Sequence, residues 1–275
     1  MRCAVITLAH GRHEHLLLQQ EALATADPPP DRYVVVAIGD EQIADVLARR
    51  EPAAEVIGLR ASRRRLPLAR ARNAGAELAL RHGAELLVFL DADCVAHPQL
   101  IARYAAAATL SGPALLCGPV GYLPPARGGG YRLERLAAQA TPHPARPVPR
   151  EGELLPAADL LLFWSLSFAI TAEGWRRVGG FCEEYEGYGG EDTDFAQLAA
   201  QAGLGMMWVG GAWAYHQHHE SEDPPLQHAE DIVQNANLFH RRWGWWPMEG
   251  WLAQFAARGV ARFERASAQW QLLDG

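Results

Sequence analysis

The sequence contains no lysine, so arginine supplies all of its permanent side-chain positive charge. Cysteine is also scarce, with four residues and no C-x-x-C pair, which argues against a zinc knuckle. No apolar stretch is long enough to span a bilayer, and Met1–Ile6 has the pattern of a first strand rather than of a signal peptide. We therefore expect a cytoplasmic protein with reduced thiols and no transmembrane segment.

Basic residues are outnumbered as well. The 25 arginines stand against 32 acidic residues, and the formal net charge of −7 argues against nucleic acid as the main partner. Apolar residues, in contrast, are plentiful: they make up 49% of the 275 residues, which is enough for a large core. The length suits one large domain or two closely joined halves.

The first third of the chain alternates apolar, strand-like segments with helical ones. This order predicts an α/β fold with a mostly parallel central sheet and helices on both faces. The expected strands are residues 3–8, 33–38, 55–59 and 85–90, and the expected helices are residues 13–24, 41–50 and 66–81.

The pattern loosens after residue 123. We expect a mobile loop over residues 124–158, which are rich in Pro and Gly, because long irregular stretches in compact domains are usually functional. Beyond this loop the sequence predicts strands at 160–171 and 205–216 and helices at 191–202, 227–243 and 251–270. The chain is accordingly divided into segments 1–123, 124–158, 159–223 and 224–275.

Two carboxylates follow the most apolar of these strands, since Glu85–Leu90 leads directly into Asp91 and Asp93. Open α/β sheets bind their ligands at the carboxyl ends of strands. Two acids at that point need a positive partner, and a divalent metal that carries a phosphate is the usual one. The alternative is an acidic turn without a function, but the buried character of the strand favours the metal and phosphate.

A second acidic motif, Gly189–Phe195, places three acids where a helix begins. Acids at a helix N-terminus complement the macrodipole, so a purely structural interpretation is open. The two glycines, however, allow a ligand to approach the backbone closely. One acid could then cap the helix while another acts as a general base.

Three histidines follow the strand that ends near residue 216. Neutral imidazole binds divalent metals well, so His216, His218 and His219 are all candidate ligands, and the strand register favours His216. Two arginine-rich segments, Arg63–Arg65 and Arg70–Gly75, could face the same ligand, although the first can equally be a solvated loop.

Taken together, these motifs resemble those of the family-2 inverting glycosyltransferases of GT-A fold, over Val5 to about Trp243. Asp91–Asp93 matches the D-x-D motif of that family, and Ala71–Gly75 matches its A-R-N-x-G segment. Gly189–Phe195 is similar to the acceptor-side motif of galactosyl- and N-acetylhexosaminyl-transferring members. The resemblance implies nucleotide contacts from Thr7, Ala9, Arg12, Asp40, Arg72, Asn73, Asp91 and Ala92.

The resemblance also implies the chemistry. Asp192 would be the catalytic base, and Asp93 with His216 would hold Mn²⁺ or Mg²⁺. A hexose or N-acetylhexosamine would pass from a nucleotide diphosphate sugar, with UDP favoured, to a hydroxyl of a glycan, a lipid-linked sugar or a small molecule. Sugar contacts would come from Glu191, Gly190 and Trp164, with Trp175 and Tyr188 as further stacking candidates.

The segments then acquire expected roles. Residues 1–123 would bind the donor, 159–223 would bind the acceptor and carry the base, and 224–275 would form a helical tail. The tryptophan-rich stretch Trp243–Pro247 leaves a peripheral contact with the inner face of the membrane open.

Two rival hypotheses remain. Asp91–Val95 also fits the D-x-D-x-[T/V] motif of haloacid-dehalogenase-like phosphatases, in which Asp91 would be the nucleophile and Asp192 with Asp194 would hold Mg²⁺. That family places its nucleophile on the first strand and usually needs a lysine, and both requirements are unmet here. The other rival is a non-catalytic module that binds a nucleotide sugar.

Overall fold

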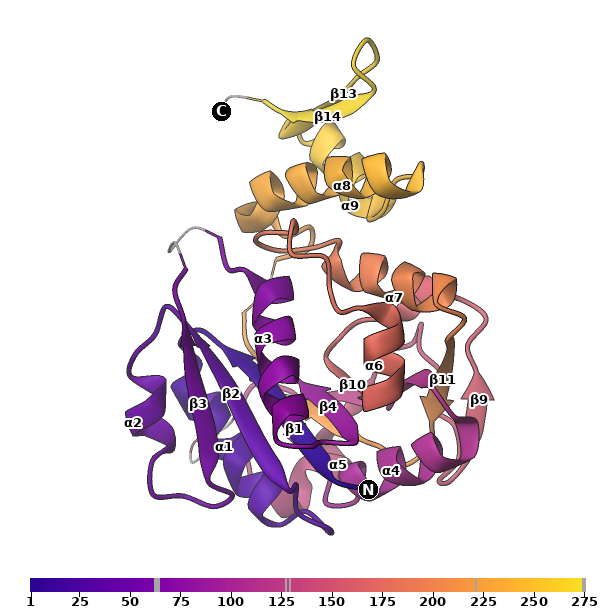
Figure 1. Cartoon of the computed structure of the whole chain (residues 1–275). Coiled ribbons are helices and arrows are strands. Elements are labelled where there is room, and N and C mark those ends of the chain that lie inside the picture. The colour runs from indigo at the N-terminus through magenta and orange to yellow at the C-terminus, as the bar shows by residue number, and fades with distance from the viewer. Residues whose placement is uncertain (62–64, 127, 129, 221, 274–275) are drawn as a thin grey trace.

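The computed structural model describes residues 1–61, 65–126, 128, 130–220 and 222–273. Within them, an eight-stranded sheet forms the centre of the molecule (Figure 1). Four of its seven strand pairings are parallel, and the exceptions involve β10 and the edge strand β9. The strand order is β3 (Ala54–Leu59), β2 (Arg32–Ile38), β1 (Cys3–Ala9), β4 (Leu86–Leu90), β10 (Ser167–Thr171), β6 (Ala114–Cys117), β11 (Gly205–Val209) and β9 (Leu154–Pro156).

Helices cover both faces of this sheet, so the predicted α/β class is confirmed. The helices α1 (His13–Ala24), α2 (Ile43–Leu47) and α4 (Leu100–Ser111) share one buried cluster with the sheet. The helices α3 (Leu68–Arg81), α6 (Ala172–Val178) and α7 (Glu191–Gln201) share the other. Gly75 lets α3 lie close to the sheet, because a Cβ there would be 2.5 Å from a methyl group of Ile6.

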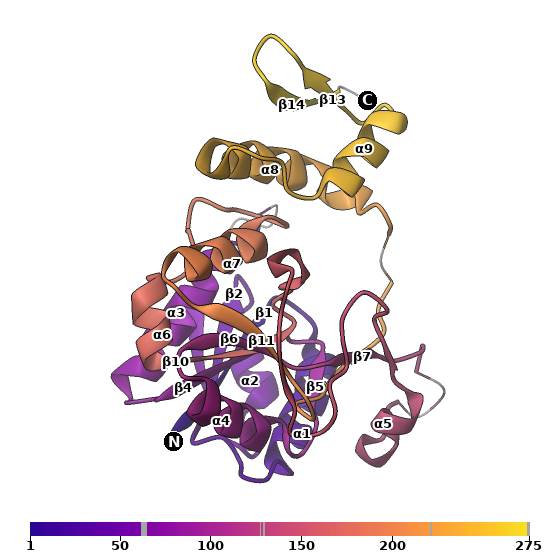
Figure 2. The ribbon, with the colours of Figure 1, turned by 90° about the vertical axis from the view of Figure 1, so that its right-hand side faces the viewer.

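A smaller sheet lies beside the carboxyl end of β4. It contains β5 (Cys94–Ala96), β12 (Ala214–His216), β7 (Val120–Tyr122) and β8 (Thr141–Pro142), in that order. The segment predicted as a mobile loop supplies β8, β9, the 3₁₀ turn η1 (Leu133–Arg135) and the short helix α5 (Leu136–Gln139). Figure 2 shows α5 at the side of the molecule.

The C-terminal residues form a separate layer beyond α7 (Figures 1 and 2). Its core is a buried cluster that includes Ile232, Val233 and Phe255. The elements are the 3₁₀ turn η3 (Leu226–His228), α8 (Ala229–Trp243), α9 (Glu249–Ala257) and a hairpin of β13 (Ala261–Glu264) and β14 (Gln269–Leu272). Among the described residues, no helix combines the length and apolarity needed to cross a membrane.

Three predicted elements were wrong in extent. The predicted helix 251–270 ends at Ala257, and the chain turns through Gly259 (φ +69°) into the hairpin. The predicted strand 160–171 begins as the 3₁₀ turn η2 (Leu160–Leu162), because Asp159 accepts a hydrogen bond from the Leu161 N–H. The predicted helix 41–50 shortens to α2, since Ala48 leaves the helical conformation (ψ 147°) and Arg49 turns the chain with a φ of +61°.

The predicted strand 205–216 was also wrong, because it is two strands in two different sheets. The break falls at Gly210, where a Cβ would lie 1.7 Å from the carbonyl oxygen of Arg150. This close backbone approach turns the chain from β11 into β12. The turn is what brings the late histidines back to the end of β4.

Candidate active site

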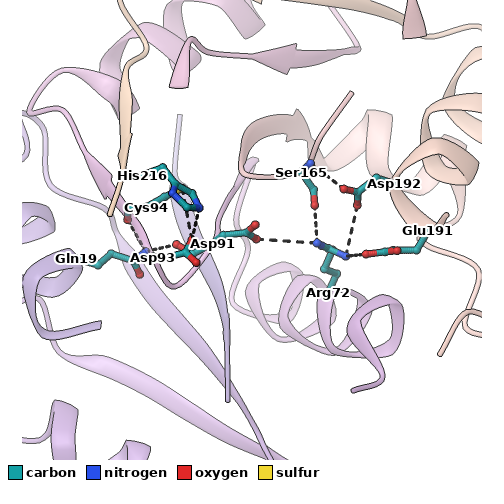
Figure 3. A network of polar contacts seen from close by, with 9 residues as sticks. All are labelled: Gln19, Arg72, Asp91, Asp93, Cys94, Ser165, Glu191, Asp192 and His216. Carbon is teal, nitrogen blue, oxygen red and sulfur yellow. Dashed lines mark hydrogen bonds and ion pairs between the residues drawn. The ribbon is translucent and has the colours of Figure 1, made fainter. Parts of the chain in front are cut away.

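The acidic turn after β4 is held by a buried glutamine. The Gln19 amide nitrogen donates hydrogen bonds to the carbonyl oxygens of Asp91 (2.7 Å) and Cys94 (2.8 Å), as Figure 3 shows. The Gln19 amide oxygen accepts hydrogen bonds from the hydroxyls of Thr7 and Tyr33, both at 2.8 Å. The turn is therefore fixed from behind by residues of β1, α1 and β2.

A possible metal centre lies on this turn. Nε2 of His216 is 3.5 Å from one carboxylate oxygen of Asp93, and Nε2 of His219 is 3.4 Å from the other. One donor atom from each residue falls within a group whose members are all within 4.8 Å of one another. His218 is exposed and is not a member of this group. The backbone N–H of Gln217 donates to the Asp93 carbonyl oxygen (2.8 Å) and holds the two segments together.

The electrostatics of this group fit a divalent cation. Burial lowers the pKa of His216, although the charge of Asp93 opposes that effect. Burial alone would raise the pKa of Asp93, but its hydrogen bond with His219 and nearby positive charge hold it below its ordinary value. A neutral imidazole beside an ionised carboxylate is the donor set that Mn²⁺ and similar metals accept.

Arg72 connects the acidic turn with α7, and it is only 4% exposed. Its guanidinium donates hydrogen bonds to the Ser165 hydroxyl and to Glu191 Oε1 (3.2 Å) (Figure 3). It also lies 3.6 Å from Asp192 Oδ1 and 4.0 Å from Asp91 Oδ1. A single buried cation thus neutralises part of a cluster of three carboxylates.

Asp192 lies at the start of α7, after Gly190 in a left-handed conformation (φ +92°). Its Oδ2 accepts a hydrogen bond from the Ser165 backbone N–H (3.1 Å). No hydrogen-bond donor among the described residues reaches Oδ1, which has only the Arg72 ion pair. The carboxylate therefore keeps unused hydrogen-bond acceptor capacity on Oδ1.

Two neighbouring carboxyl groups, those of Glu191 and Asp91, have raised pKa values. Burial raises the pKa of Glu191 to about 7, the charge of Asp192 adds to the increase, and Arg72 opposes it. Burial also raises the pKa of Asp91, against the opposing charge of Arg72. Carboxyl groups with raised pKa values are common at sites where protons are moved.

Asp194, the third acid of the motif, is not part of the site. It is fully buried and accepts hydrogen bonds from Trp243 Nε1 (2.7 Å), Arg242 Nε (2.7 Å) and the Tyr185 hydroxyl (3.2 Å). These contacts join α7 to α8. They leave Asp194 unavailable to the Mg²⁺ that the phosphatase hypothesis assigns to it.

Two of the residues expected to contact the nucleotide have intramolecular partners instead. The hydroxyl of Thr7 is buried against Gln19. Asn73 donates to the Phe181 carbonyl oxygen and to Glu183, and it accepts from the Phe181 N–H. Both side chains therefore position the turns around the site, and their predicted contact with a nucleotide remains a prediction.

The other expected nucleotide contacts lie along the end of β1 and β2. Asp40 accepts hydrogen bonds from His13 (2.8 Å) and from the N–H groups of Gly11 and Gln42 (both 3.0 Å). Burial would raise the pKa of Asp40, but these bonds hold it below its ordinary value. Ala9 and Ala92 are buried, whereas Arg12 is exposed, and its charge helps to lower the pKa of Asp93.

The three candidate stacking residues differ in how far their rings are buried. Trp175 is a core residue, stacked on Phe89 at 5.2 Å, so its expected stacking role was wrong. Trp164 is partly exposed and packs against the guanidinium of Arg146 at 5.2 Å. Tyr188 is 40% exposed; burial raises the pKa of its hydroxyl to about 12, and the nearby charges of Glu191 and Asp192 add to the increase.

Some site residues were not predicted from the sequence. Ser165 carries no local signal, because only the fold brings its N–H to Asp192. Gln19 does carry one, since a glutamine inside the apolar helix 13–24 must find partners when that helix is buried.

Sequence comparison matches residues 162–220 to a family described as the N-terminal domain of galactosyltransferase. Over 174 residues, 56% of this chain, it is 33% identical to validoxylamine A glucosyltransferases of Streptomyces hygroscopicus subsp. jinggangensis (strain 5008) and subsp. limoneus. The chain spans 40% and 37% of the length of these two relatives.

The fold is shared with solved GT-A glycosyltransferases. Residues 1–349 of TarS from S. aureus, in complex with UDP-GlcNAc, superpose with a TM-score of 0.59 at 14% identity, covering 92% of this chain and 76% of that one. GalNAc-T7 with UDP, GalNAc and Mn²⁺ gives a TM-score of 0.61 at 16% identity, covering 86% and 49%. This likeness shows the fold, and the two curated relatives that share part of the sequence are named as glucosyltransferases.

Proposed function

We propose that this protein is a metal-dependent inverting glycosyltransferase that moves a hexose or N-acetylhexosamine from a UDP-sugar to an acceptor hydroxyl. The observation that carries the proposal is the pairing of two groups in one site. The Asp93, His216 and His219 cluster lies at the acidic turn, and the Asp192 carboxylate, whose Oδ1 is ion-paired with Arg72 but accepts no hydrogen bond from a described residue, lies on the other side of Arg72 (Figure 3).

The first group would hold Mn²⁺ or Mg²⁺. A cation bound there supplies positive charge for the diphosphate of the donor. His216 and His219 add to Asp93 the imidazole nitrogens that favour Mn²⁺ at least as much as Mg²⁺. Asp91, Arg12 and Asp40 would contact the nucleotide, while Thr7, Ala9, Asn73 and Ala92 would shape its binding site and Arg72 would hold the carboxylates in place.

Asp192 would act as the general base. Its carboxylate takes the proton of the acceptor hydroxyl as that oxygen bonds to the anomeric carbon. The bond from the anomeric carbon to the diphosphate oxygen breaks on the opposite face, and the electron pair leaves with the nucleoside diphosphate. Attack from the opposite face inverts the configuration. Glu191, Gly190 and Trp164 would contact the sugars.

The donor assignment draws on the related proteins. GalNAc-T7 was solved with UDP and GalNAc, TarS with UDP-GlcNAc, and the curated relatives are named for transfer of glucose to validoxylamine A. UDP is the nucleotide of both solved structures, and a hexose or N-acetylhexosamine is the sugar class that all of these names share. The acceptor would be a glycan, a lipid-linked sugar or a small molecule.

The test is calorimetric titration of UDP, UDP-glucose and UDP-N-acetylglucosamine, with Mn²⁺ and with EDTA. We expect binding that requires the metal. Asp192→Asn should keep UDP binding within about twofold and lower transfer by about 10²–10⁴-fold, the usual contribution of a general base. Asp45→Asn, an exposed acid on α2, is the matched control and should change neither quantity. Near-normal transfer by Asp192→Asn would contradict the assignment.

The phosphatase hypothesis predicts a different result. It requires release of phosphate from an aryl phosphate in the presence of Mg²⁺ and no response to a nucleotide sugar. The hydrogen bonds that occupy Asp194 and the GT-A fold of the solved neighbours both count against it.

A further inference from the structure

A cavity lies on the opposite side of the small sheet from the group formed by Asp93, His216 and His219. Tyr215 and His216 are consecutive residues of β12, so their side chains point to opposite faces of the sheet. His216 faces Asp93, whereas Tyr215 faces a cavity of about 340 Å³. This volume is at the lower end of the range that small-molecule sites occupy.

Two aromatic rings line one wall of the cavity. The rings of Trp213 and Tyr215 are nearly parallel, with an angle of 10° between their planes and 6.4 Å between their centroids. Gly121 pairs with Tyr215 in the neighbouring strand and has no side chain to cover them. A Cβ at residue 121 would lie 3.6 Å from both rings and only 2.6 Å from Ala140.

The polar groups around these rings have unused hydrogen-bonding capacity. His97 Nδ1 accepts from the Gln99 N–H, which leaves the proton of a neutral ring on Nε2. Burial lowers the pKa of His97 and so favours this neutral ring. Among the described residues, no group bonds His97 Nε2, the Tyr215 hydroxyl or the Trp213 indole N–H.

The charges at the rim select against an ionic ligand. Glu151 lines the cavity, and its carboxylate accepts a hydrogen bond from the guanidinium of Arg103. Arg103 also donates to Gln99 Oε1 (2.9 Å), so the Gln99 amide nitrogen stays free for a ligand. The one carboxylate among the described lining residues is thus paired with Arg103, and the other polar groups that line the cavity are neutral donors and acceptors.

We propose that this cavity binds a neutral pyranose unit of a saccharide. The C–H face of a pyranose packs against an aromatic ring, here the partly exposed ring of Trp213, and its hydroxyls match the free groups of His97, Gln99 and Tyr215. The site is separate from the reacting centre because the small sheet lies between them. Its role would be to anchor saccharide acceptors, and that role alone rests on the proposed function.

Saturation-transfer NMR tests the proposal without nucleotide or turnover. The probes are maltotriose, cellotriose and triacetylchitotriose, each added to the full chain. We expect at least one trisaccharide to bind the unmodified protein, and Trp213→Ala to weaken that binding by roughly tenfold. Phe263→Ala, which removes an exposed ring from the C-terminal hairpin, is the matched control and should leave it unchanged.

A second variant guards against misfolding of Trp213→Ala. Gln99 is exposed, so Gln99→Leu should fold normally and still weaken the same trisaccharide. Failure of all three probes to bind at millimolar concentration, or unchanged binding in both cavity variants, would overturn the proposal. Metal-dependent UDP binding by the same variants is measured separately: its absence from the unmodified protein would overturn the proposed function and leave the saccharide result standing.

Discussion

Arg72 is the residue on which the charge balance of the site depends. Its guanidinium lies within 4.0 Å of Asp91, Glu191 and Asp192, and it is buried. A buried cation with several anionic partners holds them at a fixed spacing, but each partner is only partly neutralised. Burial, to which the charge of Asp192 adds, therefore raises the pKa of Glu191 although Arg72 opposes the increase.

Glu191 should make stability depend on pH. Its pKa rises from 4.5 in the unfolded chain to about 7 in the folded protein, so the folded state keeps a proton that the unfolded state has lost. The resulting stability, about 3 kcal/mol at most, is fully present below the lower pKa and is lost as the pH rises through the higher one. Urea unfolding at pH 5 and pH 8 measures it.

The informative variant is Glu191→Gln, which cannot ionise. Relative to the unmodified protein, its unfolding free energy should be higher at pH 8 than at pH 5, by about 2–3 kcal/mol. Glu173→Gln, an exposed glutamate on α6, should show the same difference at both pH values. A Glu191→Gln difference that does not change with pH would show that Glu191 is ionised throughout.

His219 and His218 form a natural pair for a metal test. His219 lies 3.4 Å from Asp93, and its neighbour His218 is exposed. His219→Ala should weaken Mn²⁺ binding at least about tenfold, because a ligand contributes no less than the groups that orient ligands. Titration followed by electron paramagnetic resonance measures free Mn²⁺. His218→Ala is expected to bind Mn²⁺ as the unmodified protein does, and equal losses in the two variants would refute this choice of ligand.

At the scale of elements, the contact between α7 and α8 supports the site from behind. Asp194→Ala would leave Arg242 and Trp243 without their shared acceptor, and the loss of one partner of a buried ion pair costs about 3–5 kcal/mol. Urea unfolding should show this decrease at pH 7. Asp159→Ala removes an acid that caps only a short turn and should cost about 1 kcal/mol. Similar losses in the two variants would mean that the α7–α8 contact is weak.

The elements also show how far sequence patterns reach. The ranges expected for β1, β2 and α1 agree with the structure to within one residue. Continuous apolar runs predict the two strands, and the helical segment between them is also recognised from its own residues, so these signals are local in the sequence. The antiparallel strand β10 depends on pairing with β4 and β6, which are distant in sequence. Its bounds, and the division of β11 from β12, could not be read from a local pattern.

In the candidate site, too, some residues could be proposed from local sequence patterns, whereas others depend on contacts between distant parts of the chain. Asp93 and Asp192 stand in motifs with a fixed spacing, so the sequence alone could propose them, and their roles stay predictions. The choice between His216 and His219 needed the turn after β12, and both contact Asp93. For Asn73, the motif predicts a nucleotide contact, which stays a prediction, and only the fold shows that its amide is hydrogen-bonded to the backbone of Phe181.

For the whole molecule, ligand binding should appear as thermal stabilisation. A ligand that binds only the folded state at one hundred times its dissociation constant adds about 2.7 kcal/mol. For a chain of this size, that corresponds to a rise in Tm of about 5–10 °C. We expect this rise with UDP and Mn²⁺ together in differential scanning fluorimetry. EDTA should abolish it, and a shift that persists in EDTA would contradict metal-dependent binding.

A transfer of the acidic turn to another protein would require Gln19 as well. Its amide connects the hydroxyls of Thr7 and Tyr33 with the carbonyl groups of Asp91 and Cys94. A graft of Asp91–Cys94 onto another scaffold would carry the carboxylates but not the amide that shapes their backbone. The smallest portable unit is therefore three-dimensional: the end of one strand, the glutamine of a helix some seventy residues earlier, and the two hydroxyls that orient it.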